Sequence, residues 1–149
     1  FETVLSTISL SRGLYGCKPN QPHIEGILSQ LSLLDKKNAM IKELSGGMKR
    51  RVLIAKALSH DPKVLFLDEP CSNLDGQSTR EIETLLLETA AAGTRIIMAT
   101  HDMGQARRLA ADVIFMKSGR IAETGLASDV FDAPKTSELK AFLKGDILE

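Results

Sequence analysis

The chain has 149 residues, 43% hydrophobic and 26% charged, which indicates one soluble domain with a packed core. Its 19 basic residues balance 19 acidic residues, and this lack of a basic excess argues against a nucleic-acid partner. No apolar run approaches the ~20 residues of a membrane-spanning helix, so we expect any membrane role to go through a partner protein. The two cysteines, Cys17 and Cys71, lack the spacing of a metal site and are expected to be reduced thiols.

Helices are predicted in the first part of the chain, because apolar residues recur there at helical spacing. Val4, Leu5 and Ile8 mark the inner face of a first helix. The apolar positions of a second helix are Ile24, Ile27, Leu28, Leu31 and Leu34. Residues 16–22 form a loop between the two, since two prolines and a glycine interrupt any helix there. A third, largely buried helix is predicted from about residue 47 to 59.

Strands and helices alternate from residue 61 onward. The continuous apolar run at residues 64–67 is typical of a strand that is buried on both faces. Residues 78–81 fit a capping box that opens a helix, and Gly93 ends this helix. Residues 94–99 are predicted to form the next buried strand, which a short helix from about residue 104 to 110 follows.

An antiparallel hairpin is predicted next, with residues 113–116 and 120–123 pairing across a turn at residues 118–119. The two strand–helix crossovers before it predict an α/β fold, with a mostly parallel sheet and helices on its faces. The change of pattern predicts two parts. Residues 1–60 form a helical subdomain, and residues 61–149 form the strand–helix part.

The predicted start of the third helix is a candidate anion site. A helix start exposes unpaired N–H groups and the positive end of the helix dipole. Ser45 can cap the helix or donate to a phosphate oxygen, while Gly46 and Gly47 allow a ligand to approach the backbone closely. The basic run at residues 49–51 is expected on the solvated face of the same helix.

Two carboxylates and a histidine follow neighbouring strands. Asp68 and Glu69 come at the end of the first strand, and His101 follows the second. Ligands of open α/β sheets bind beyond the carboxyl ends of the strands, so we expect these side chains to converge at one edge. An aspartate at this place suits Mg²⁺, and the adjacent glutamate suits polarisation of an attacking water.

Four segments together resemble one protein family. They are residues 44–48, 65–70, 72–75 and 100–102. In this order and at this spacing they are similar to the signature loop, Walker B motif, D-loop and switch histidine of the nucleotide-binding subunits of ABC transporters. The resemblance implies an ATPase of the P-loop NTPase (RecA-like) class, with a helical signature subdomain inserted in its α/β core.

The resemblance also implies roles for the residues at the strand ends. Asp68 would orient Mg²⁺ through its water shell, and Glu69 would act as the general base toward the attacking water. His101 would contact the γ-phosphate of ATP. The reaction implied is ATP hydrolysis, with ATP and Mg²⁺ as the bound groups.

Subunits of this family work as head-to-tail dimers. Ser45, Gly46 and Gly47 would therefore bind the ATP held by a second nucleotide-binding subunit rather than ATP held by the same chain. Asp75, in the D-loop, would couple the two sites across the dimer interface.

One motif that the family requires does not occur in the sequence. No stretch reads GxxxxGK[ST], the phosphate loop, and in the family this loop, the adenine-stacking aromatic residue and the Q-loop glutamine all precede a point near Phe1. We therefore expect this chain to be a fragment that by itself binds ATP weakly or not at all and is inactive.

The direction of transport is interpreted from two sets of segments. Residues 123–125, 128–135 and 141–148 resemble the tails of bacterial importer subunits that serve oxyanions such as tungstate or phosphate, or polar amino acids. Residues 12–16 and 46–51 instead resemble exporter subunits of the polysaccharide and drug type. The importer is favoured because the tail match is longer, and the exporter stays an alternative.

A function of another class is also possible for such a sequence, namely a non-catalytic interaction module or an ABC-type ATPase that acts outside transport. A transporter subunit is the preferred interpretation, because Glu69 and His101 are present and no coiled-coil heptads or basic blocks occur. It implies transmembrane permease subunits and a substrate-binding protein as partners, and a peripheral location on the cytoplasmic face of the inner membrane.

Overall fold

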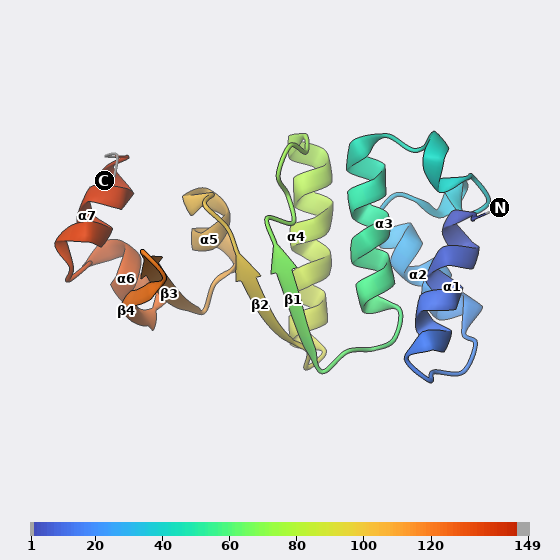
Figure 1. Ribbon diagram of the computed structural model, residues 1–149, viewed down its shortest axis with the longest axis horizontal. Coiled ribbons are helices and arrows are strands. Elements are labelled where there is room, and N and C mark those ends of the chain that lie inside the picture. Colours follow the sequence, from blue (N-terminus) through green and yellow to red (C-terminus); the bar gives the residue numbers. More distant parts are fainter. Residues whose placement is uncertain (1, 146–149) are drawn as a thin grey trace. The chain divides into compact units, whose positions relative to one another are not determined.

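The first part of the chain is helical in the computed structural model, which describes residues 2–145. Its helices are α1 (Val4–Leu14), α2 (Gln21–Gln30) and α3 (Gly46–Leu58), followed along Figure 1 from blue to blue-green. Each begins after a polar residue whose side chain accepts a backbone N–H of the first turn. These capping residues are Thr3, Asn20 and Ser45. Two short 3₁₀ turns, η1 (Leu34–Lys36) and η2 (Ile41–Glu43), connect α2 with α3.

The three helices bury one shared apolar core. Its members include Val4, Ile8, Ile24, Leu28, Val52 and Ala55. The predicted faces of the first two helices are thus confirmed, with one exception. Helix α2 ends at Gln30, so Leu34 falls in the turn η1 and is 38% exposed instead of extending the helical stripe.

A strand–helix–strand unit follows, as predicted. It consists of β1 (Val64–Asp68), α4 (Gly76–Ala91) and β2 (Arg95–Ala99). The two strands are parallel, with Val64 opposite Arg95 and Asp68 opposite Ala99. Helix α4 buries Ile82, Leu85 and Leu86. This crossover confirms an α/β unit with a parallel sheet.

The predicted start of this helix is wrong by three positions. The N-cap of α4 is Asp75, whose Oδ1 accepts the backbone N–H groups of Gln77 and Ser78 at 3.0 and 2.9 Å. Ser78 therefore lies inside the first turn, where its hydroxyl donates to Asp75 Oδ2 at 2.9 Å. A carboxylate that satisfies two free N–H groups is a better cap than the serine three residues later.

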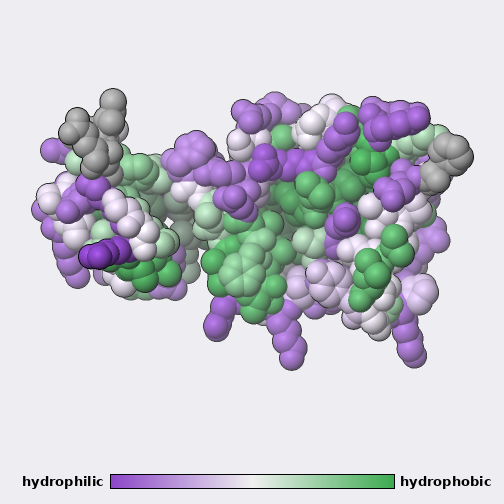
Figure 2. All heavy atoms as spheres, viewed as in Figure 1, coloured by the Kyte–Doolittle hydropathy of each residue, from purple (hydrophilic) through white to green (hydrophobic). Residues whose placement is uncertain are grey.

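The prediction that both strands are buried on two faces is also wrong. In β1 only Leu65 is buried, whereas Val64 and Phe66 are 44% and 72% exposed. Ile97 of β2 is 47% exposed. Helix α4 packs against β2, and the apolar surface of the strand pair is seen over β1 and β2 in Figure 2.

The chain divides into two compact units, Phe1–Ala99 and Thr100–Glu149. The first unit contains everything described so far. The boundary proposed at residue 60 separates the helices from the strand–helix part inside this unit and stays a prediction. Within the residues that the structure describes, no helix is long and apolar enough to cross a membrane.

The second unit is built on the predicted hairpin. Strands β3 (Asp112–Lys117) and β4 (Arg120–Leu126) pair antiparallel, with a register shift between Phe115 and Met116. The short helix α5 (Met103–Leu109) precedes them. Two further helices, α6 (Ala127–Asp132) and α7 (Ser137–Lys144), form the tail. Residues 146–148 of the predicted importer tail lie outside the described residues.

One carboxylate connects this hairpin to the tail. Glu123 of β4, only 9% exposed, accepts the backbone N–H groups of Lys135 and Thr136 at 3.0 and 2.9 Å. It also accepts the Thr136 hydroxyl at 2.7 Å. The Lys135 N–H, followed by the two donors of Thr136, holds the pKa of Glu123 below its ordinary value.

A glutamine at this position should destabilise the chain in a pH-dependent way. Because the folded state lowers the pKa of Glu123, its carboxylate contributes stability above the unfolded-state pKa, about 4.5, and loses this contribution as pH falls through the folded-state pKa. We therefore expect Glu123→Gln to lower the thermal midpoint at pH 7 and the deficit to shrink in acid.

Thermal unfolding of both proteins from pH 7 down to pH 3, followed by circular dichroism, measures this difference. The exposed carboxylate of Asp112, on the paired strand, offers a matched control in Asp112→Asn. A deficit for Glu123→Gln that stays constant over this range would mean that the carboxylate charge is not what the donors recognise.

Candidate functional site

The start of α3 is shaped to receive an anion. Ser45 has extended backbone angles, and its Oγ accepts the N–H of Met48 at 3.2 Å, which leaves its own O–H free to donate. The first N–H groups of a helix have no partner within it. A Cβ placed on Gly46 would meet nothing within 4 Å, so the surface in front of the helix is open. A phosphate oxygen can therefore approach this backbone directly.

Gly47 also takes part in packing. A Cβ at Gly47 would lie 3.0 Å from Cδ2 of Leu74, a tight contact that would push the leucine side chain aside by a few tenths of an ångström. The start of α3 thus packs tightly against the segment between β1 and α4, which belongs to the same unit. Sequence reasoning assigned both glycines to ligand access, and the structure assigns Gly47 a packing role as well.

Asp68 and Glu69 stand where β1 ends. Asp68 is exposed and pairs with Ala99 on the neighbouring strand. Glu69 is half-buried, and its N–H donates to the carbonyl of Ala99 at 2.9 Å. Its φ of +46° places it in the left-handed region, which costs a residue with a side chain about 1–2 kcal/mol. Such a conformation persists only where neighbouring contacts hold it.

The segment after Glu69 consists of tight turns. The N–H of Ser72 donates to the carbonyl of Glu69 at 3.2 Å, and Asn73 is left-handed with φ of +59°. The segment ends at Asp75, the cap of α4. The Ser78 N–H, followed by the Ser78 hydroxyl, lowers the pKa of Asp75, so this carboxylate is held ionised. Its coupling role in a dimer stays a prediction.

Two arginines of α3 contradict the prediction that the basic run lies on the solvated face. Arg50 Nη1 donates to the carbonyl of Ser72 and Nη2 donates to that of Asp68, each at 3.3 Å. Arg51 Nη1 lies 3.1 Å from Oε2 of Glu81 and 2.9 Å from the carbonyl oxygen of Leu31. The local sequence pattern does not predict these inward-facing guanidinium groups, because their acceptors are distant in sequence.

His101 belongs to the second unit. It is exposed and lies between β2 and α5, whose N-cap is Asp102. The Oδ1 of Asp102 accepts the N–H of Gln105 at 3.0 Å, which fixes the first turn of α5 just after the histidine. That His101 meets Glu69 at a nucleotide stays a prediction.

The donor groups suit a magnesium ion that arrives with its nucleotide. Within residues 2–145, no group of three or more histidine, cysteine, aspartate or glutamate side chains could hold a metal. Mg²⁺ is commonly held by one or two carboxylates together with substrate phosphates and water. The exposed carboxylate of Asp68 supplies one such ligand, so the residues present fit a nucleotide-bound ion.

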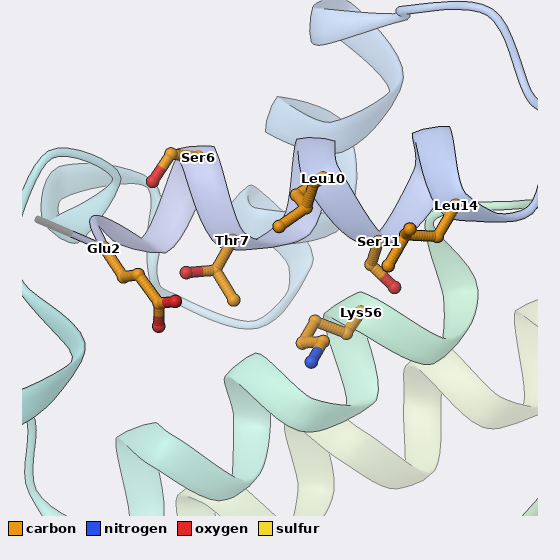
Figure 3. Close-up of a pocket in the computed structure, with 7 residues that line it drawn as sticks. All are labelled: Glu2, Ser6, Thr7, Leu10, Ser11, Leu14 and Lys56. Atoms are coloured by element: carbon orange, nitrogen blue, oxygen red, sulfur yellow. The ribbon is translucent and has the colours of Figure 1, made fainter.

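A groove of about 370 Å³ runs between α1 and α3. Figure 3 shows the side chains of α1 on one side and Lys56 of α3 on the other. The lining residues are Glu2, Ser6, Thr7, Leu10, Ser11, Leu14 and Lys56. Leu10 and Leu14 are 62% and 79% exposed, so this surface offers apolar contact area flanked by one acidic and one basic side chain.

Comparison with known proteins agrees with these motifs. A protein-family profile described as ABC transporter matches residues 3–72. The octopine permease ATP-binding protein P of Rhizobium meliloti is 38% identical over 122 residues, which are 82% of this chain and 47% of that protein. The methionine import ATP-binding protein MetN of Pasteurella multocida is 38% identical over 145 residues, covering 95% of this chain and 42% of its own length. The chain thus spans somewhat less than half of these relatives.

Solved structures show the same architecture. The structure of cbiO1 from Clostridium perfringens, described as part of the ABC transporter complex cbiONQ, matches 88% of this chain and 53% of its own. Its identity is 33% and its TM-score is 0.72. A structure described as the ATP binding subunit of an ABC transporter shares the fold, with a TM-score of 0.80 over 96% of this chain and 62% of its own, at 24% identity. These neighbours confirm the predicted P-loop NTPase fold class.

Proposed function

The chain belongs to the ATP-binding proteins of the ABC transporter family, and from this premise we propose that it supplies the signature and Walker B part of an ATPase that drives amino-acid import through a membrane permease. The observation that carries the proposal is the pair Asp68 and Glu69 at the end of β1, beside an α3 start open to phosphate. The complete ATPase, meaning a protein that joins these residues to a phosphate-loop half, would perform the hydrolysis.

The reaction is hydrolysis of the terminal phosphoanhydride bond. The oxygen of water attacks the γ-phosphorus, the bond from this phosphorus to the bridging oxygen of ADP breaks, and ADP and phosphate leave. Glu69 accepts the proton of the attacking water, which makes that water a better nucleophile. Bound Mg²⁺, held on the side of Asp68, would neutralise charge on the phosphate oxygens. His101 would donate a hydrogen bond to the γ-phosphate.

The phosphate-binding groups of α3 serve a different nucleotide. We assign Ser45, Gly46 and Gly47 to the ATP of a second subunit in a head-to-tail dimer, where the hydroxyl and the free N–H groups meet its γ-phosphate. Asp75 would lie at the interface between the subunits. Each ATP is then enclosed by two protomers, so each site needs groups from both subunits.

An amino acid is the proposed class of cargo. Relatives at 36–41% identity include ATP-binding proteins named for arginine, glutamine and L-cystine, alongside the octopine and methionine proteins. These names favour import over export, and they favour amino acids over oxyanions such as tungstate or phosphate. Cargo selection would rest with a substrate-binding protein and the permease.

The groove between α1 and α3 is the proposed contact with the permease. Its exposed leucines, Leu10 and Leu14, could receive the apolar side of a helix from the membrane subunit, with Lys56 and Glu2 orienting it. ATP-driven closure of the two subunits would then move this surface and the permease with it. The protein would act as a peripheral subunit on the cytoplasmic face of the inner membrane.

Measuring nucleotide binding distinguishes this chain alone from the same chain joined to a phosphate-loop half. We expect the 149-residue chain alone to bind Mg-ATP more weakly than about 1 mM, since it lacks a phosphate loop and the remaining contacts are few. Joined to a phosphate-loop half from an ABC ATP-binding protein, it should bind ATP and hydrolyse it. Calorimetric titration measures the binding of ATP, and phosphate release measures its hydrolysis. Micromolar binding by the chain alone would contradict the first expectation, and a joined protein that binds but never hydrolyses would contradict the ATPase assignment.

A further inference from the structure

We propose that Arg50 is a positioning residue that fixes the backbone of Glu69 from the signature helix. The inference rests on the proposed function, because Glu69 matters in this way only if it is the base of ATP hydrolysis. It adds a connection between the α3 start, which meets one nucleotide, and the carboxylate that acts on another.

The Arg50 guanidinium donates hydrogen bonds to the backbone before and after Glu69. Its two terminal nitrogens donate, each at 3.3 Å, to the carbonyl of Asp68 on one side of Glu69 and to that of Ser72 on the other. Between these carbonyls the chain makes a left-handed turn at Glu69, where the Ser72 N–H closes back on the Glu69 carbonyl at 3.2 Å. The planar fork of arginine suits two acceptors at a fixed separation, and a lysine ammonium does not reproduce it.

The left-handed turn explains why such a clamp is needed. Residues with a Cβ avoid this region, so the segment would relax toward ordinary angles if its contacts were removed. A change of backbone angle at Glu69 swings the side chain, because the carboxylate lies several bonds from the Cα. A displacement of about 1 Å at a catalytic group can lower a rate by about a hundredfold.

A second contact ties the same segment to the same helix. Cδ2 of Leu74 packs closely against Gly47, where a Cβ would lie only 3.0 Å from it. The helix start and the turn segment are therefore held together at two places, through Arg50 and through Gly47. A phosphate that seats against Ser45 and Gly46 would fix α3, and through these contacts it would fix Glu69.

The test compares Arg50→Met, Arg50→Gln and Arg50→Lys in the complete ATPase. Arg50→Met keeps an unbranched apolar stem and removes all donors, and it should lower kcat about tenfold or more while the Kd for Mg-ATP stays within about twofold. Arg50→Gln retains one amide donor group and should recover part of the rate. Arg50→Lys should fall well short of the wild type, since the charge without the fork cannot hold both carbonyls.

Two further variants distinguish this positioning role from a general loss of charge or structure. Lys49→Met removes an exposed charge of the same sign from the same helical turn, and an equal loss of kcat there would overturn the clamp in favour of a charge effect. In the Glu69→Gln background, Arg50→Met should leave the residual rate unchanged, because it acts through the base. A further drop in that background, or an unchanged kcat for Arg50→Met alone, would overturn the inference.

These outcomes are distinct from failure of the proposed function. If the complete ATPase with the wild-type sequence releases no phosphate from ATP, the function itself is wrong. If it does, and Glu69→Gln removes the activity while Arg50→Met has no effect, only the positioning role is wrong.

Discussion

Glu69→Gln should reduce ATP turnover by the complete ATPase about a hundredfold or more, while ATP binding and dimer formation survive. A general base contributes on the order of a hundredfold to ten-thousandfold, and a glutamine amide cannot accept the proton of the attacking water. The glutamine keeps the shape of the glutamate, so the left-handed turn at position 69 should be preserved. The substitution removes an interaction made in the transition state, so kcat should fall with little change in the affinity for ATP.

Steady-state phosphate release, equilibrium binding of Mg-ATP and sizing of the protein with and without ATP check this prediction. Asp112→Asn serves as a control, because it removes one exposed carboxylate from the second unit. Turnover of the Glu69→Gln protein at the wild-type rate would refute the assignment of the base. If the variant lost ATP binding as well as turnover, Glu69 would instead be a residue that binds the nucleotide.

Breaking the ion pair between α3 and α4 should cost the chain about 2–3 kcal/mol of unfolding free energy. Arg51 and Glu81 are 13% and 18% exposed in their side chains, and the atoms Nη1 and Oε2 lie 3.1 Å apart. The other oxygen of Glu81 accepts from the Ser32 hydroxyl at 3.0 Å and from Gln77 Nε2 at 3.1 Å. Glu81→Gln therefore leaves a mostly buried guanidinium without its counter-charge, which is the costly way to break such a pair.

Urea unfolding at constant pH measures the loss. The double variant Arg51→Met with Glu81→Leu should lose less than the sum of its two single variants, since neither charge is then left alone. Asp35→Asn provides the matched control in the same unit. Asp35 pairs with Lys36 at 3.1 Å, but the side chains are 69% and 47% exposed, and such a pair contributes up to about 1 kcal/mol. Equal losses for Glu81→Gln and Asp35→Asn would show that burial does not strengthen the first pair.

Elements with a regular apolar pattern could be predicted from the sequence. The inner faces of the first two helices, the crossover from β1 through α4 to β2, and the β3–β4 hairpin all follow from spacing within each segment. The start of α4 could not be fixed in the same way, because Asp75 and Ser78 both have capping side chains three residues apart. The hydrogen bonds from Gln77 and Ser78 to Asp75 decide between them.

Features that depend on distant partners were missed. An apolar run such as residues 64–67 predicts a strand, but it does not say which segments cover its faces, and Phe66 proves to be 72% exposed. Arginines on a helix are usually solvated, and the acceptors of Arg50 and Arg51 lie 18 to 30 positions away in sequence. The site motifs themselves were readable because each is a short, contiguous stretch of sequence.

The central claim is that the start of α3 and the carboxylates of β1 serve two different ATP molecules. Complete ATPases linked in tandem test it, with Glu69→Gln and Ser45→Arg placed either in opposite halves or in the same half. In opposite halves both changes fall in one composite site, so roughly half of the turnover should remain. In the same half they damage both sites, and turnover should be nearly lost. A same-half protein that turns over ATP as fast as the opposite-half protein, or faster, would contradict the claim.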